Sequence, residues 1–99
     1  MISNLNLSVY SDWEQKAKQY WEEKNYSQAA KLYEAAIERE PDVKSLYWDL
    51  GLMLLLQGQE VEAQTTWLVG MADGEAEDIE QWTQELLHVL ETEAERQRL

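Results

Sequence analysis

The chain resembles itself when it is shifted by 34 residues. Large side chains then align with large ones, and small side chains align with small ones. Six aligned pairs share this period without a gap: Trp13 with Tyr47, Ala17 with Gly51, Tyr20 with Leu54, Ala29 with Ala63, Tyr33 with Trp67, and Ala36 with Gly70. A fixed period of this length predicts a stack of repeated supersecondary units that bury their apolar faces against each other.

Helix start and stop signals agree with this period. Ser11 followed by Glu14 forms a capping box that is expected to open the first helix. Asn25 or Ser27 is expected to cap the second helix, and Asp42 is a possible cap for the third. Pro41 and Gly58 stop the second and third helices. The expected helices cover about residues 12–24, 27–40, 43–57, 59–71 and 77–96.

These helices define the expected fold class, which is all-α. No strand-like alternation is evident in the sequence. Because the connections are only a few residues long, neighbouring helices must run antiparallel. The sequence therefore predicts helical hairpins stacked in antiparallel order, preceded by a flexible N-terminal arm over residues 1–9.

Residues 10–43 resemble a tetratricopeptide repeat. The matching positions are Trp13, Ala17, Tyr20, Tyr26, Ala29, Tyr33, Ala36 and Pro41. Two positions depart from the family pattern: Lys16 stands where the family usually has Leu, and Lys24 where it often has Gly. The resemblance implies a short solenoid made of two repeats and a C-terminal capping helix.

A second, weaker repeat is expected over residues 44–77. Its matching positions are Leu50, Gly51, Leu54, Gly58, Ala63, Trp67 and Gly70, while Glu75 stands where the family has proline. Residues 78–99 resemble either a capping helix or the first helix of a third repeat. The apolar stripe of this last helix consists of Ile79, Trp82, Leu86, Val89 and Leu90.

A looser resemblance concerns residues 42–44, 50–59 and 63–67. These segments look like the N-terminal repeat region of bacterial SPINDLY-type O-linked N-acetylglucosamine transferases, and similar segments precede FkbM-type methyltransferases. The resemblance implies that the chain is the non-catalytic front of a larger enzyme. No catalytic residue carries over, because nothing in the sequence resembles a sugar-nucleotide site.

Composition narrows the classes of partner. The chain has 8 Lys and Arg against 20 Asp and Glu, which gives a net charge of -12. Nucleic acid and anionic membranes are therefore not expected as partners, because both require clustered cations. A basic or apolar protein segment is favoured instead. The sequence contains no cysteine and no secretory signal, so a cytoplasmic protein without disulfides is expected.

The resemblance also implies a binding groove along the first helix of each repeat. The candidate partner-binding residues are Lys18, Trp21, Trp48, Leu52, Leu55 and Leu56. Two alternatives remain open for Trp48 and Leu52. Either the last helix or the N-terminal arm covers them, or they line an open groove, as expected for a contiguous apolar patch.

No catalytic, cofactor or metal site is expected. His88 has no second His and no Cys with which to bind zinc, and the acids of residues 73–80 lack the spacing of a calcium loop. Those acids are better explained as first-turn carboxylates of the last helix. The expected function is a non-enzymatic protein-interaction module that binds a peptide or protein segment. The alternative is homo-oligomerisation, in which the partner is a second copy of the chain.

Overall fold

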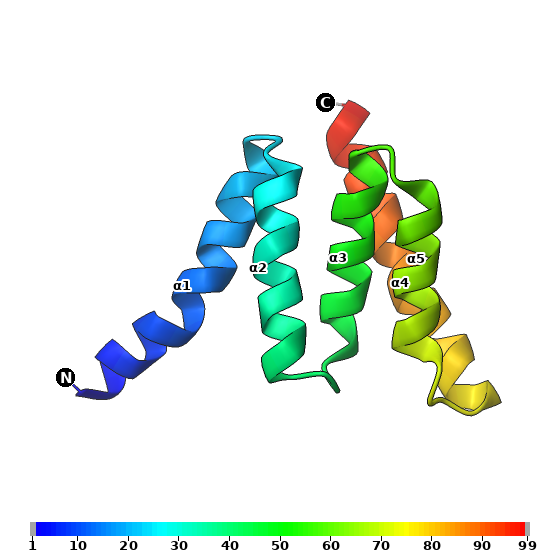
Figure 1. The fold of residues 1–99 in the computed structure, drawn as a ribbon, viewed down its shortest axis with the longest axis horizontal. Coiled ribbons are helices and arrows are strands. Elements are labelled where there is room, and N and C mark those ends of the chain that lie inside the picture. The colour runs from blue at the N-terminus through cyan, green and yellow to red at the C-terminus, as the bar shows by residue number, and fades with distance from the viewer. Residues whose placement is uncertain (1, 99) are drawn as a thin grey trace.

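A computed structural model describes the backbone of residues 2–98 and the side chains of residues 12–98. Every regular element in this part of the chain is an α-helix. The five helices are α1 (Ile2–Glu22), α2 (Tyr26–Arg39), α3 (Lys44–Leu56), α4 (Glu60–Met71) and α5 (Ala76–Arg98). Successive helices run in opposite directions along the stack (Figure 1). The all-α prediction is therefore confirmed.

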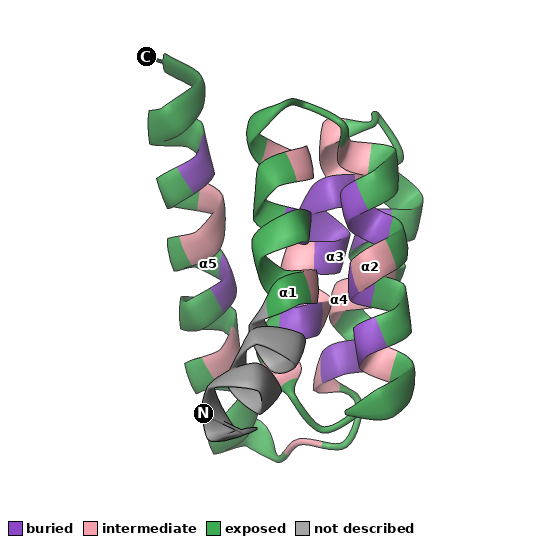
Figure 2. Ribbon diagram, turned by 90° about the vertical axis from the view of Figure 1, so that its left-hand side faces the viewer, coloured by how far each residue is buried: buried purple, intermediate pink, exposed green. Residues whose placement is uncertain are grey.

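The third helix is the centre of the fold. It packs against α2, α4 and α5, whereas α1 packs mainly on α2. The buried residues are concentrated where α1, α2 and α3 meet (Figure 2). The core cluster there consists of Ala17, Ala29, Ala30, Tyr33, Ala36, Leu46, Leu50, Leu52 and Met53. This position follows from sequence, because α3 is apolar on all sides and such a helix must be buried.

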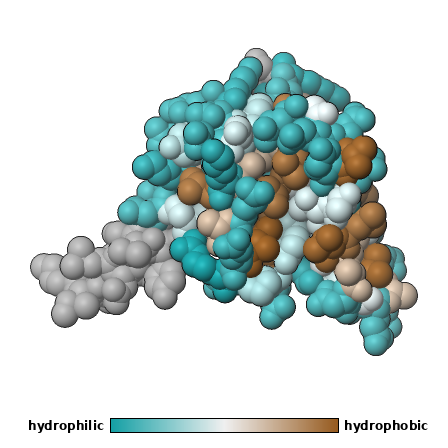
Figure 3. Space-filling model, viewed as in Figure 1, coloured by the Kyte–Doolittle hydropathy of each residue, from teal (hydrophilic) through white to brown (hydrophobic). Residues whose placement is uncertain are grey.

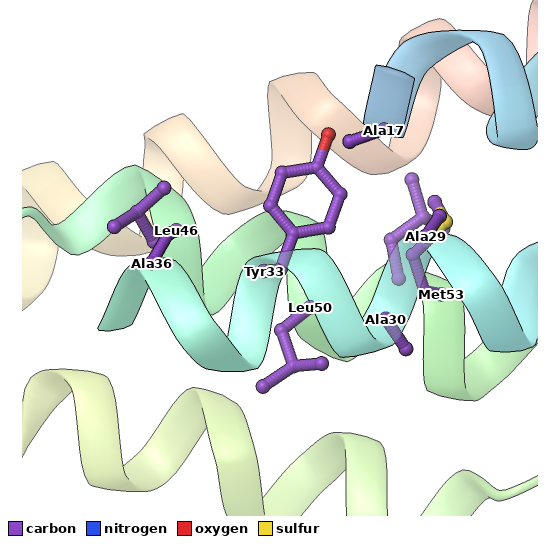
Figure 4. Packing of buried hydrophobic residues seen from close by; sticks show 9 residues of the cluster. Ala17, Ala29, Ala30, Tyr33, Ala36, Leu46, Leu50 and Met53 are labelled. Atoms are coloured by element: carbon purple, nitrogen blue, oxygen red, sulfur yellow. The ribbon is translucent and has the colours of Figure 1, made fainter. Parts of the chain in front are cut away.

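Large and small side chains interlock within each hairpin. In the α3–α4 hairpin, Trp67 lies directly against Gly51, and Gly70 lies against Tyr47. In the α1–α2 hairpin, Ala17 is fully buried, and the hydroxyl group of Tyr33 is directed towards it (Figure 4). These contacts confirm the prediction that an aromatic ring of one helix fills the space beside a small residue of the other.

The turns that close the two hairpins share one geometry. Lys24 in the first turn has φ 62°, and Gly58 in the second has φ 82°, so both lie in the left-handed region. In each turn the next residue donates its N–H to the carbonyl oxygen five positions back, over 2.7 Å and 2.9 Å respectively. Lys24 and Gly58 are 34 residues apart, so this hydrogen-bond motif, common at helix C-termini, recurs with the sequence period.

The first helix begins earlier than the sequence predicted. It starts at Ile2, so Ser11 lies inside the helix, and the capping box predicted at Ser11 and Glu14 is wrong. The backbone of residues 2–9, predicted as a flexible arm, belongs to the same helix. The side chains of residues 1–11 lie outside the described part of the structure.

Other helix ends lie close to their predicted positions. Asn25 occupies the N-cap of α2, but its side chain makes no capping hydrogen bond. Val43, rather than Asp42, occupies the N-cap of α3, so the prediction for Asp42 is wrong. Glu77 and Asp78 lie in the first turn of α5, where Asp78 accepts a hydrogen bond from the Glu75 N–H. First-turn carboxylates favour a helix N-terminus, as expected.

Candidate functional site: a cleft between the first and last helices

A cleft of about 320 Å³ lies between α1 and α5, with α3 at its base. Figure 2 shows α5 beside α1 on this side of the molecule. The cleft is lined by Lys18, Trp21 and Glu22 from α1, Asp49 from α3, and His88, Val89, Thr92, Glu93 and Arg96 from α5. Both signs of charge, one indole ring and one aliphatic side chain therefore converge in a single depression.

Helical spacing brings these side chains together. Lys18 lies three residues before Trp21 and four before Glu22, so its side chain neighbours both of theirs on α1. The α5 residues follow the same rule from His88 to Arg96. Since residues of both helices line the same cleft, this side of α5 lies opposite that face of α1.

A buried carboxylate ties α5 to α1 across the cleft. Glu93 is only 3% exposed and accepts a hydrogen bond from Trp21 Nε1 over 2.8 Å. Gln97 and Arg96 also contact the Glu93 carboxylate, and the Arg96 guanidinium lies 5.8 Å from the centroid of the Trp21 ring. The Gln97 amide reaches the Tyr26 hydroxyl at the start of α2, over 3.3 Å. These contacts fix one wall of the cleft in place.

The carboxyl group of Asp49, at the base of the cleft, has a raised pKa. Burial raises the pKa of its carboxyl group to about 6; the Lys18 ammonium acts in the opposite direction, and Glu14 adds to the increase. Desolvation is therefore stronger than the attraction of the nearby cation. The carboxyl group of Asp49 changes charge near neutral pH, next to the Lys18 side chain.

The structure separates the six predicted partner-binding residues into three groups. Lys18 and Trp21 line the cleft. Trp48 and Leu52 are buried, at 1% and 2% exposure, and Trp48 Nε1 lies 3.4 Å from Glu85 Oε1 on α5. Burial therefore argues against an open groove at these two residues, and the Glu85 contact places the last helix over Trp48. Leu55 and Leu56 are half-buried and pack against the core rather than lining the cleft.

Sequence reasoning missed most of the cleft wall. The sequence does not predict Asp49 as a binding residue, because only the packing of α3 places its side chain at the base of the cleft. The sequence predicts Val89 only as part of the apolar stripe of the last helix, and it predicts no binding role for Glu93 or Arg96. His88, for which the sequence predicts no metal-binding role, is exposed and lines the cleft. Periodicity alone gives no signal for the docking of α5 across the groove.

Other kinds of site are not formed by the described residues. Among residues 12–98, no three His, Asp or Glu side chains come close enough together to hold a metal ion. Within the helices that the structure describes, none combines the length and apolarity that crossing a bilayer requires. The cleft is one of several depressions on the described surface in which polar and apolar side chains converge.

Comparisons of this chain with protein-family models, with curated proteins and with solved structures gave no match.

Proposed function

We propose that the chain is a protein-interaction module that binds a peptide segment in the cleft between α1 and α5. The observation that carries this proposal is the convergence of Lys18, Trp21, Asp49 and Arg96 around one depression of about 320 Å³. That volume lies at the lower end of the roughly 300–1,000 Å³ typical of ligand pockets. It suits one or two side chains of a longer segment.

The chemistry of the lining suits a polypeptide. An extended backbone offers N–H donors and carbonyl acceptors in alternation. Asp49 and Glu22 supply acceptors, while Lys18 and Arg96 supply donors, so both kinds of backbone group find partners. The half-buried Trp21 ring and Val89 offer an apolar surface for one side chain of the segment. Tryptophan in such a position commonly dominates binding energy.

The repeated architecture supports assignment to the tetratricopeptide repeats. Trp67 on Gly51 and the paired left-handed turns at Lys24 and Gly58 follow the 34-residue period. We propose that the hairpins form a short solenoid of two repeats closed by α5. In this proposal, the likeness to repeat segments that precede transferases makes the chain a non-catalytic recognition part of a larger cytoplasmic protein.

A binding role fits the cleft better than a catalytic role. Its side chains include no Ser or Cys nucleophile in contact with His88, and the carboxylate of Glu93 is engaged by Trp21 and Gln97. General acid–base chemistry requires a proton-transfer group within hydrogen-bond reach of a bound substrate. Glu93 instead takes part in the hydrogen bonding that holds α5 to α1.

The proposal is tested by selecting peptides from a random library on the full chain and measuring their affinity by fluorescence anisotropy. Trp21→Ala is expected to weaken binding by about thirtyfold, the scale of an interface hot spot. Lys18→Gln is expected to weaken binding by about two- to fivefold, as for an exposed ion pair. Circular dichroism establishes that each variant remains helical.

Lys31→Gln is the matched control. It removes the same charge from an exposed position on α2, outside the cleft. Affinity that changes equally in Lys18→Gln and Lys31→Gln would show only a general effect of net charge. Affinity unchanged in Trp21→Ala would remove the cleft as the binding site.

A further inference from the structure

Five large aliphatic side chains are exposed on α4 and α5: Val61, Leu68 and Val69 on α4, and Ile79 and Leu87 on α5. Val61 and Leu68 on α4 are 72% and 69% exposed, and Leu87 on α5 is 52% exposed. Val61 and Leu68 are seven residues apart and so share one face of α4. Hydrophobic side chains are visible over α4 in Figure 3, among mostly polar neighbours. We call Val61, Leu68 and Leu87 the α4–α5 edge.

One contact shows that the two helices meet along this edge. The Thr83 hydroxyl of α5 lies 3.9 Å from the Met71 sulfur of α4. Leu68 lies one turn before Met71, and Leu87 lies one turn after Thr83. Because α4 and α5 run in opposite directions, Leu68 and Leu87 both lie on the same side of this contact along the edge (Figure 1).

The repeat explains why Leu87 is exposed. Across the 34-residue period, Leu87 aligns with Met53 of α3, which is fully buried. The helix that carries Met53 is packed by α2 on one side and α4 on the other. Among the described helices, α5 packs mainly on α3 and α4, and it also contacts α1 through Glu93 and α2 through Gln97. Met53 belongs to the core cluster that α3 forms with α1 and α2, whereas no described helix covers Leu87 to the same extent.

Charge identifies the kind of helix that fits. From residue 45 to residue 95 the chain contains twelve acidic residues and no Lys or Arg. Glu80, Leu87 and Glu91 lie seven and four residues apart, on one face of α5, and both glutamates are exposed. Glu60 is exposed beside Val61 at the start of α4. The edge is thus an apolar strip bordered by carboxylates.

From this arrangement we infer that the α4–α5 edge binds a cationic amphipathic helix of a partner protein. The apolar stripe of that helix packs on Leu68 and Leu87, and its Lys or Arg side chains pair with Glu80 and Glu91. Two copies of the same edge repel each other because both are acidic. An anionic lipid surface is repelled for the same reason. This surface is separate from the cleft, so the inference does not depend on the proposed function.

The test uses two synthetic helical peptides with the same leucine stripe, one with lysine and one with glutamate at every polar position. Isothermal titration calorimetry against the full chain is expected to show binding of the lysine peptide only, weakened by added salt. Leu68→Gln and Leu87→Gln are each expected to weaken that binding by about tenfold. Glu80→Gln with Glu91→Gln is expected to reduce the salt dependence.

Val69→Gln is the matched control. Val69 is 57% exposed on α4, but it lies in the groove that α4 forms with α2, away from α5. Its replacement is expected to change affinity by less than about twofold. The inference is overturned if Val69→Gln weakens binding as much as Leu68→Gln does, or if both peptides bind equally. It is also overturned if sedimentation shows self-association of the full chain that Leu87→Gln abolishes, because the occupant is then a second copy.

Discussion

The indole ring of Trp67 occupies the space that a side chain on Gly51 would need. A Cβ atom at Gly51 would lie 2.0 Å from Trp67 Nε1 and 2.5 Å from two further ring atoms. The ring is held there by a hydrogen bond from its Nε1 to the Trp48 carbonyl oxygen, over 3.3 Å. Position 51 therefore requires glycine, because an aromatic ring of the next helix packs directly on its backbone.

Gly51→Ala is expected to destabilise the fold, although alanine favours a helix interior by about 1 kcal/mol over glycine. The clash with the Trp67 ring forces a shift that costs about 1–3 kcal/mol beyond this gain. Urea unfolding followed by circular dichroism measures the net loss. Trp67→Leu removes the clash, so Gly51→Ala should cost much less in that background. Strict additivity of the two changes would contradict the proposed interlock.

Lys24 and Gly58 provide a second, reciprocal prediction. Lys24 adopts φ 62° in a turn whose counterpart holds Gly58 at φ 82°. A left-handed conformation strains a side chain by roughly 1 kcal/mol, which glycine avoids. Lys24→Gly is therefore expected to raise the free energy of unfolding by about 0.5–1 kcal/mol.

The reverse substitution is the control for that prediction. Gly58→Lys is expected to lower the free energy of unfolding by about 1 kcal/mol, because no side chain crowds this position and the cost comes from the backbone alone. Thermal and urea melts of both variants measure the two changes. Opposite signs are required; if both variants lose stability, the turns are not equivalent.

The helices were predictable because their signals are local. Pro41 and Gly58 act on their own backbone, and α2 and α3 accordingly end at Arg39 and Leu56. The capping box at Ser11 was misleading because a cap motif can also lie within a longer helix. Nothing in the spacing of polar and apolar residues distinguishes these two cases.

The cleft was less predictable because it depends on how α5 docks. The resemblance to tetratricopeptide repeats predicted a groove at Lys18 and Trp21, and both residues line the cleft. It also pointed to Trp48 and Leu52, since an aromatic and aliphatic stripe looks the same in an open groove and under a covering helix. The contact between Trp21 and Glu93 spans 72 residues, and no local pattern encodes it.

Trp48 and Trp21 are expected to respond differently to replacement. Trp48 is buried, so Trp48→Ala should lower the free energy of unfolding by about 3–5 kcal/mol through the cavity it leaves. Trp21 is half-buried in the cleft wall, so Trp21→Ala should cost less stability and act mainly on peptide affinity. Urea unfolding and anisotropy on the same samples separate the two effects. Equal losses of stability would contradict the placement of Trp21 at the cleft.

Asp49 is expected to make stability depend on pH. The pKa of its carboxyl group is about 6 in the folded chain, against 3.8 for an unperturbed aspartate. The folded state therefore holds the proton more tightly than the unfolded state does, and stability contributed by this group is lost as pH rises from about 4 to about 6.

Asp49→Asn removes that dependence because the amide cannot ionise. The variant is expected to be more stable than the natural chain by about 3 kcal/mol at pH 7, with most of the difference gone by pH 4. Urea unfolding across this range measures it. Asp12→Asn, which changes an exposed carboxylate on α1, should shift stability by less than about 0.5 kcal/mol at any of these pH values. A stabilisation by Asp49→Asn that persists at pH 4 would mean that the gain comes from packing, and that ionisation of Asp49 at the base of the cleft is not the cause.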